Sequence, residues 1–158
     1  MKQQIKKGAE GRKALVNGIN QLADAVTSTL GPRGRNVIYK NSMGQVQSTK
    51  DGVSIAKEIE SLENPFENLG IQMVKQAAIK TADKAGDGTT TSTLLAQSMI
   101  NEGIKHLDNG ANVVEIKKGI EVATKEVVSY LKKTISKDIS SDGQITQIAT
   151  VSANNDEE

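Results

Sequence analysis

Residues 85–91 read Ala-Gly-Asp-Gly-Thr-Thr-Thr and form a turn between two segments with the apolar periodicity of helices. Glycine lets the backbone approach a ligand closely, and a loop that opens a helix presents free N–H groups to an anion. The consecutive threonines add hydroxyl donors that suit phosphate oxygens. Asp87 would repel a phosphate unless Mg²⁺, held by one carboxylate and by phosphate oxygens, lay between them. The turn therefore predicts a site for a nucleoside triphosphate and Mg²⁺.

A simpler interpretation of the same turn is structural. Asp-Gly is a common turn, and Asp and Thr are preferred N-caps, so this stretch also suits the plain start of a helix. The sequence contains neither the Walker A pattern GxxxxGK[ST] nor GxGxxG before a helix. A nucleotide would be bound outside those two schemes, and the turn alone leaves both interpretations open.

The segments around the turn predict helices. Pro65 reads as the first residue of the preceding helix, with Asn64 as its N-cap. Asn112 and Glu115 form a capping-box-like start for a later helix. Apolar residues at helical spacing add segments at residues 10–30, 94–107, 113–131 and 145–148.

Two further glycine-containing turns divide the N-terminal part. Gly31 permits a left-handed cap and Pro32 cannot continue a helix, so the first helix is expected to end there. Strand signals at 36–39 and 46–49 predict a hairpin, and residues 50–52, Lys-Asp-Gly, form the turn after it. The expected fold class is mainly α, a helical bundle with a small β-hairpin.

Composition excludes several function classes. The chain has 158 residues, about one domain by length, with no cysteine and one histidine, His106. This excludes disulfide scaffolds, thiolate nucleophiles, cysteine-based metal sites and HExxH zinc sites. A net charge of +1 and 2% aromatic residues argue against a nucleic-acid partner, and the lack of a long apolar run argues against a membrane span. We expect a cytoplasmic protein, since a cysteine-free chain suits a reducing compartment.

Taken together, the turns resemble one family. The stretches TLGPRGRNV at 29–37, TKDGVSIAKEIE at 49–60 and AGDGTTT at 85–91 match the group I chaperonins, the GroEL-like 60 kDa chaperonin family, in order and spacing. FENLGIQMVKQAA at 66–78 and ATVSANND at 149–156 are similar as well. RGRNV and SANND look like group I rather than the archaeal and eukaryotic cytosolic group, and the resemblance covers nearly the whole chain.

The resemblance implies a role for each turn. Asp87 resembles the Mg²⁺ ligand, and Asp51 resembles a catalytic carboxylate that helps to position the attacking water. Thr29, Lys50 and Thr90 resemble residues around a K⁺ site. The residues that would contact ATP are Thr29, Leu30, Gly31, Pro32, Lys50, Asp87, Gly88, Thr89, Thr90 and Thr91.

By the same resemblance, residues 1–134 correspond to the N-terminal half of an equatorial ATP-binding domain, and residues 135–158 to the start of an intermediate domain. The family's apical domain, later catalytic aspartate and base-contacting residues have no counterpart, so we expect a chain cut before its second half. Other chaperonin subunits in a ring are the expected partners. A GroES-like co-chaperonin and non-native proteins would need the missing apical domain.

Three functions remain open at this point. The leading hypothesis is a segment of an ATP-dependent chaperonin that assists protein folding by binding and hydrolysing ATP in a ring. Because the catalytic set is incomplete, we expect negligible ATPase activity from this chain alone. The alternatives are a truncated nucleotide-binding or assembly module without independent chaperone activity, and a helical structural protein without a ligand.

Overall fold

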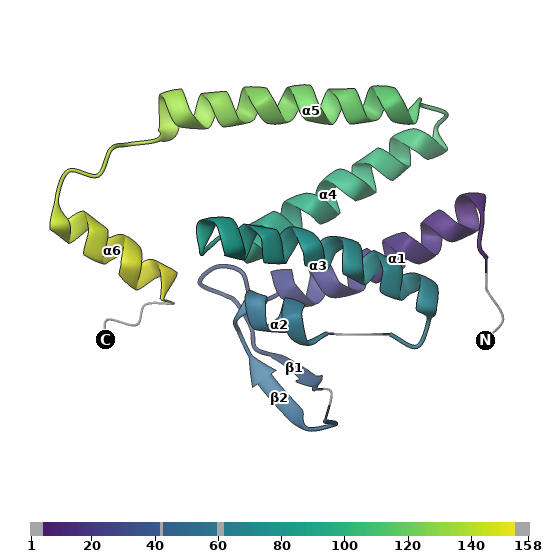
Figure 1. The fold of residues 1–158 in the computed structure, drawn as a ribbon, viewed down its shortest axis with the longest axis horizontal. Helices are drawn as coiled ribbons and strands as arrows, with labels where there is room; N and C mark the ends of the chain where they lie inside the picture. Colours follow the sequence, from purple (N-terminus) through teal and green to yellow (C-terminus); the bar gives the residue numbers. More distant parts are fainter. Residues whose placement is uncertain (1–4, 42, 60–61, 154–158) are drawn as a thin grey trace. The chain divides into compact units, whose positions relative to one another are not determined.

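The computed structural model describes residues 5–41, 43–59 and 62–153, and helices dominate it (Figure 1). In chain order the elements are α1 (Gly8–Thr27), β1 (Val37–Lys40), β2 (Val46–Thr49), α2 (Gly52–Glu58), α3 (Pro65–Ala85), α4 (Thr89–Asp108), α5 (Val113–Tyr130), a π-helical turn (Leu131–Ile135) and α6 (Asp142–Ser152). The mainly α class with a small hairpin is confirmed. The chain divides into two compact units, one ending at Lys105 and one beginning at His106.

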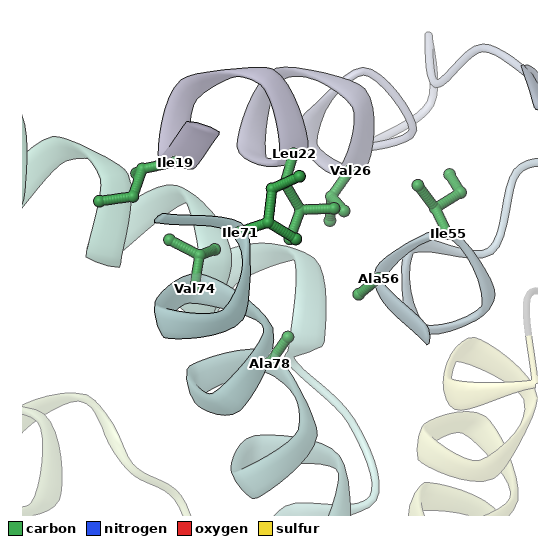
Figure 2. Packing of buried hydrophobic residues seen from close by; sticks show 8 residues of the cluster. All are labelled: Ile19, Leu22, Val26, Ile55, Ala56, Ile71, Val74 and Ala78. Atoms are coloured by element: carbon green, nitrogen blue, oxygen red, sulfur yellow. The ribbon is translucent and has the colours of Figure 1, made fainter. Parts of the chain in front are cut away.

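The core of the first unit is aliphatic and joins three helices. Figure 2 shows side chains from α1, α2 and α3 pointing toward one another, as expected for a chain with so few aromatic residues. Burying each of these larger side chains contributes roughly 1.5–3 kcal/mol before entropy is counted. The cluster consists of Ile19, Leu22, Val26, Ile55, Ala56, Ile71, Val74 and Ala78.

Helices α1 and α3 approach each other so closely that main chain meets main chain. A Cβ atom built on Gly18 of α1 would overlap the carbonyl group of Glu67, and one built on Gly70 of α3 would overlap the carbonyl oxygen of Leu15. At the rim of this crossing, Gln21 Nε2 donates to Glu67 Oε2 at 3.0 Å. The crossing therefore requires glycine on both helices.

The hairpin is antiparallel, with Val37 opposite Thr49 and Lys40 opposite Val46. Its turn is organised by the Asn41 side chain, whose Oδ1 accepts hydrogen bonds from the backbone N–H of Met43 at 3.0 Å and of Gln45 at 2.9 Å. Two residues, Lys50 and Asp51, separate the end of β2 from the start of α2.

Helix α1 ends earlier than the sequence pattern predicts. The expected end at residue 30 is wrong, because regular helix stops at Thr27. The Ser28 hydroxyl donates to the Ala25 carbonyl and the Thr29 hydroxyl to the Val26 carbonyl, each at 2.7 Å. Such side-chain hydrogen bonds compete with the backbone hydrogen bonds of a helix. The residues after Thr27 therefore form an irregular turn.

Side-chain caps fix two other helix starts as predicted. Asn64 Oδ1 accepts from the Phe66 N–H at 3.0 Å, with Pro65 as the first residue of α3. Asn112 Oδ1 accepts from the Val114 N–H at 2.8 Å and begins α5. Both caps satisfy backbone donors that the first helical turn leaves without partners.

The second unit consists of the end of α4, α5, the π-helical turn and α6. Large apolar side chains on α5 are exposed, among them Val113 at 60% and Val127 at 56%. None of the helices in the described ranges is both long and apolar enough to cross a membrane. The domain boundary expected at 134/135 stays a prediction, and the end of the SANND stretch, residues 154–156, lies outside the described residues.

The glycine crossing generates a stability prediction. Gly70→Ala should lower the free energy of unfolding by about 1–3 kcal/mol, the usual cost of forcing extra volume into a close-packed contact. Gly119→Ala is the matched control, because a Cβ there, in the exposed middle of α5, meets no atom within 4 Å. Replacing a helical glycine in open space should stabilise the protein by about 0.5–1 kcal/mol. Urea unfolding followed by far-UV circular dichroism measures both, and equal effects would contradict the close crossing.

Candidate functional site

The AGDGTTT stretch is a short link between two long helices. Helix α3 ends at Ala85, and Gly86 follows in the left-handed conformation, with φ of 74° and its N–H donated to the Ala82 carbonyl at 2.9 Å. Gly88 also has a positive φ, 83°, and α4 begins at Thr89. The three threonines therefore form the first turn of α4, and the turn is indeed a helix start.

Helix α4 begins directly after Gly88. The Gly88 carbonyl accepts from the Ser92 N–H at 2.8 Å, which places Gly88 at the cap position without a side chain that could cap. The first N–H groups of a helix have no acceptor within the helix, and the aligned peptide dipoles give this end a partial positive charge. A 20-residue helix thus directs its donors at the link.

The Thr89 hydroxyl distinguishes this start from an ordinary one. Thr89 is 4% exposed, and its Oγ1 has no hydrogen-bond partner within the part of the chain that the structure describes. One turn later the equally buried Thr93 donates its hydroxyl to the Thr89 carbonyl at 2.8 Å. A buried hydroxyl without a partner costs about 1–3 kcal/mol, and the Thr89 hydroxyl keeps its donor for an acceptor outside the described residues.

Three turns that are distant in the sequence meet at Gly52, the first residue of α2. A Cβ atom built there would overlap Thr90 Oγ1, would lie 3.2 Å from Val26 Cγ1 and would lie 3.5 Å from Thr29 Oγ1. The structure thus brings together the Thr29 and Thr90 hydroxyls, which the resemblance implied to be neighbours. The sequence pattern predicts Gly52 only as part of a turn, and no local signal marks its contact with Thr29 and Thr90.

Asp51 is the N-cap of α2. Its Oδ1 accepts from the Val53 N–H at 3.3 Å, and its Oδ2 accepts from the Ser54 N–H at 2.9 Å and the Ser54 hydroxyl at 2.6 Å. Burial raises the pKa of Asp51, but these hydrogen bonds and the charge of Lys57 together lower it below the ordinary value. The carboxylate is therefore ionised at neutral pH, and Oδ1 keeps a lone pair for a further donor.

The remaining predicted residues lie on the same turns and are more accessible. Asp87 is exposed, and its Oδ1 accepts from the Gly88 N–H at 2.5 Å. Leu30, Gly31, Pro32, Lys50 and Thr91 are also exposed, and none of them is among the atoms that crowd Gly52. Their predicted contacts with a nucleotide stay predictions.

The donor set suits a metal ion that is shared with phosphate. Within residues 5–41, 43–59 and 62–153, no three His, Asp or Glu side chains gather into a group that could hold a metal ion. Asp87 is a carboxylate next to the open start of α4. Mg²⁺ commonly takes one or two protein carboxylates and completes its coordination with phosphate oxygens and water. Asp87 fits that arrangement.

The Asp51 cap generates a pH prediction. Since the pKa of Asp51 is lowered in the folded state, its charge stabilises the fold above the unfolded value of 3.8, and this contribution is lost as the pH falls through the folded pKa. Asp51→Asn keeps a capping oxygen but does not titrate. At pH 6 the native chain should therefore have a higher urea midpoint than Asp51→Asn. The difference between the two midpoints should shrink below about pH 3.8. A difference that is the same at pH 6 and pH 3 would contradict the role of the charge.

Comparison with known proteins places the fold and the family. A crystal structure of a group III chaperonin in the open state superposes with a TM-score of 0.78 at 25% sequence identity, and the match covers 94% of this chain and 29% of that one. The chain thus spans less than a third of the chaperonin it matches. The assignment to group I stays a prediction. The model of the TCP-1/cpn60 chaperonin family matches residues 22–158, and the chain belongs to that family.

Proposed function

We propose that this chain binds the phosphates of ATP at the start of α4, as part of a chaperonin that assists protein folding. The observation that carries the proposal is the buried Thr89 hydroxyl without a partner among the described residues, at the start of a 20-residue helix. Membership of the chaperonin family supports the folding role.

The first turn of α4 would hold the phosphates through hydrogen bonds. Backbone N–H groups of residues 89–91 and the threonine hydroxyls would donate to phosphate oxygens, and Gly88 would let the phosphates approach the main chain closely. Asp87 would hold Mg²⁺, which when bound neutralises phosphate charge. Lys50 adds a positive charge, and residues 29–32 would contact the nucleotide from the end of α1.

Asp51 would orient the attacking water during hydrolysis. Three of the roughly four acceptor positions of its carboxylate are already occupied, so the second lone pair of Oδ1 is the one left for water. The hydroxyl oxygens of Thr29 and Thr90 and the main-chain carbonyl of Lys50 would surround a K⁺ ion, because the Lys50 ammonium group has no lone pair to offer a cation. Hydrolysis at a useful rate would need groups from the rest of the longer protein, so this chain alone should show negligible ATPase activity.

The wider setting follows from the same proposal. The longer protein would assemble with other subunits into a ring in the cytoplasm. It would enclose non-native proteins beneath a GroES-like co-chaperonin. These partners would be gripped by regions that this chain does not contain.

The exposed apolar side chains of α5 favour one second candidate, an assembly module that docks onto other chains without chaperone activity. Size-exclusion chromatography with and without Mg²⁺–ATP separates the two. A ring-sized particle supports the chaperonin, and a monomer that binds nucleotide supports the module. A helical protein without any ligand would show no Mg²⁺–ATP binding, and Asp87→Ala would then change nothing.

Two buried threonines in α4 provide a matched test of phosphate binding. Thr89→Val removes the hydroxyl that lacks a partner, so it should leave the fold as stable or raise the free energy of unfolding by about 1 kcal/mol. The same change should weaken Mg²⁺–ATP binding about tenfold or more, the effect of losing a hydrogen bond to a charged group. Isothermal titration calorimetry and urea unfolding measure the two quantities.

Thr93→Val is the control because its hydroxyl already donates to the Thr89 carbonyl. It should destabilise the fold by about 1 kcal/mol and leave the affinity of the folded protein unchanged. If Thr89→Val binds Mg²⁺–ATP as tightly as the native chain, the Thr89 hydroxyl is not part of a phosphate site.

A further inference from the structure

Gly52 is buried at a place where the backbone does not require glycine. It is the first residue of α2, directly after the capping Asp51, and it is not among the described glycines with a positive φ. Most residues adopt the conformation of a helix start, and glycine there costs entropy on folding. The reason for glycine at this position must therefore be the space around it.

That space is filled from three directions. The Thr90 hydroxyl of α4 occupies the volume that a Cβ atom would need, Val26 of α1 lies 3.2 Å from that point, and the Thr29 hydroxyl lies 3.5 Å from it. Both hydroxyls belong to residues of the proposed nucleotide and K⁺ site. The Thr29 hydroxyl is itself oriented by its bond to the Val26 carbonyl at 2.7 Å.

Helix α2 cannot easily move away to make room. Its start is held by the Asp51 cap, and Ile55 and Ala56 are 0% and 1% exposed in the core. Its end is held by Lys75 of α3, whose Nζ donates to the Lys57 carbonyl. A side chain at position 52 would therefore act mainly on Thr90, and since Thr is branched at Cβ, its hydroxyl moves only by a change of rotamer.

We propose that Gly52 is a positioning residue of the phosphate site: its missing side chain lets the start of α2 rest against the Thr90 hydroxyl and keeps that hydroxyl facing the Thr29 turn. The inference rests on the proposed nucleotide site. Gly52 holds no ligand through a side chain; it acts through Thr90. The same contact brings Gly52, the residue after Asp51, against the first turn of α4.

A double-mutant cycle tests this role. Mg²⁺–ATP affinity is measured by titration calorimetry for the native chain, Gly52→Ala, Thr90→Ala and the combined variant. Gly119→Ala serves as the control for adding a methyl group to a helical glycine, because a Cβ there meets no atom within 4 Å. We expect Gly52→Ala to weaken binding about tenfold in the native background and to have no further effect with Thr90→Ala, where the displaced atom is absent.

The outcomes separate the possible failures. If Gly52→Ala binds like the native chain, or if its effect multiplies with that of Thr90→Ala, the positioning role is wrong. A loss of unfolding free energy with unchanged affinity would make Gly52 a packing residue only, and would also overturn the proposal.

If the native chain binds no Mg²⁺–ATP, the proposed function is contradicted. The contact between Gly52 and Thr90 can still be tested by protein stability. In that case Gly52→Ala should lower the urea midpoint in the native background. It should lower the midpoint much less in the Thr90→Ala background. Equal losses in the two backgrounds would overturn the inference independently of the nucleotide.

Discussion

The main-chain contact between α1 and α3 is the constraint on which the first unit depends. Because Gly18 and Gly70 let carbonyl groups of the opposite helix fill the space of a side chain, the two helices can cross at one place only. The link of residues 86–88 then fixes where α4 begins relative to α3. The turn that follows α1 and the first turn of α4 both reach Gly52, so the geometry of the candidate site follows from that crossing.

Within the candidate site, two side chains at helix starts have unusual hydrogen bonding. Asp51 caps α2 with both carboxylate oxygens, and the hydrogen bonds that make it a good cap also keep it ionised. Thr93 supports the start of α4 by a hydroxyl bond, whereas Thr89 has a buried hydroxyl with no partner within the described residues. This difference between two buried threonines of one helix is the feature on which the proposed phosphate site rests.

Local chemistry explains which features could be predicted from the sequence. The caps at Asn64 and Asn112 and the hairpin depend on neighbouring residues, and each is found where the pattern indicates. The end of α1 was misplaced because Ser28 and Thr29 bond back to carbonyls of the helix, an outcome that apolar periodicity cannot show. The resemblance placed Thr29 and Thr90 in one site, but the local sequence gives no sign that Gly52 lies between them.

The buried glycines of this chain differ in whether a second substitution could compensate for their replacement. At Gly18 and Gly70 the atoms in the way belong to the partner's main chain, which every amino acid shares, so no second substitution at Glu67 or Leu15 could suppress the damage. At Gly52 the nearest obstacle is a side-chain hydroxyl, so a smaller residue at position 90 could act as a suppressor, with loss of that hydroxyl. A substitution at the helix crossing therefore keeps its full cost in stability, while the cost at Gly52 can be removed by a second substitution at position 90.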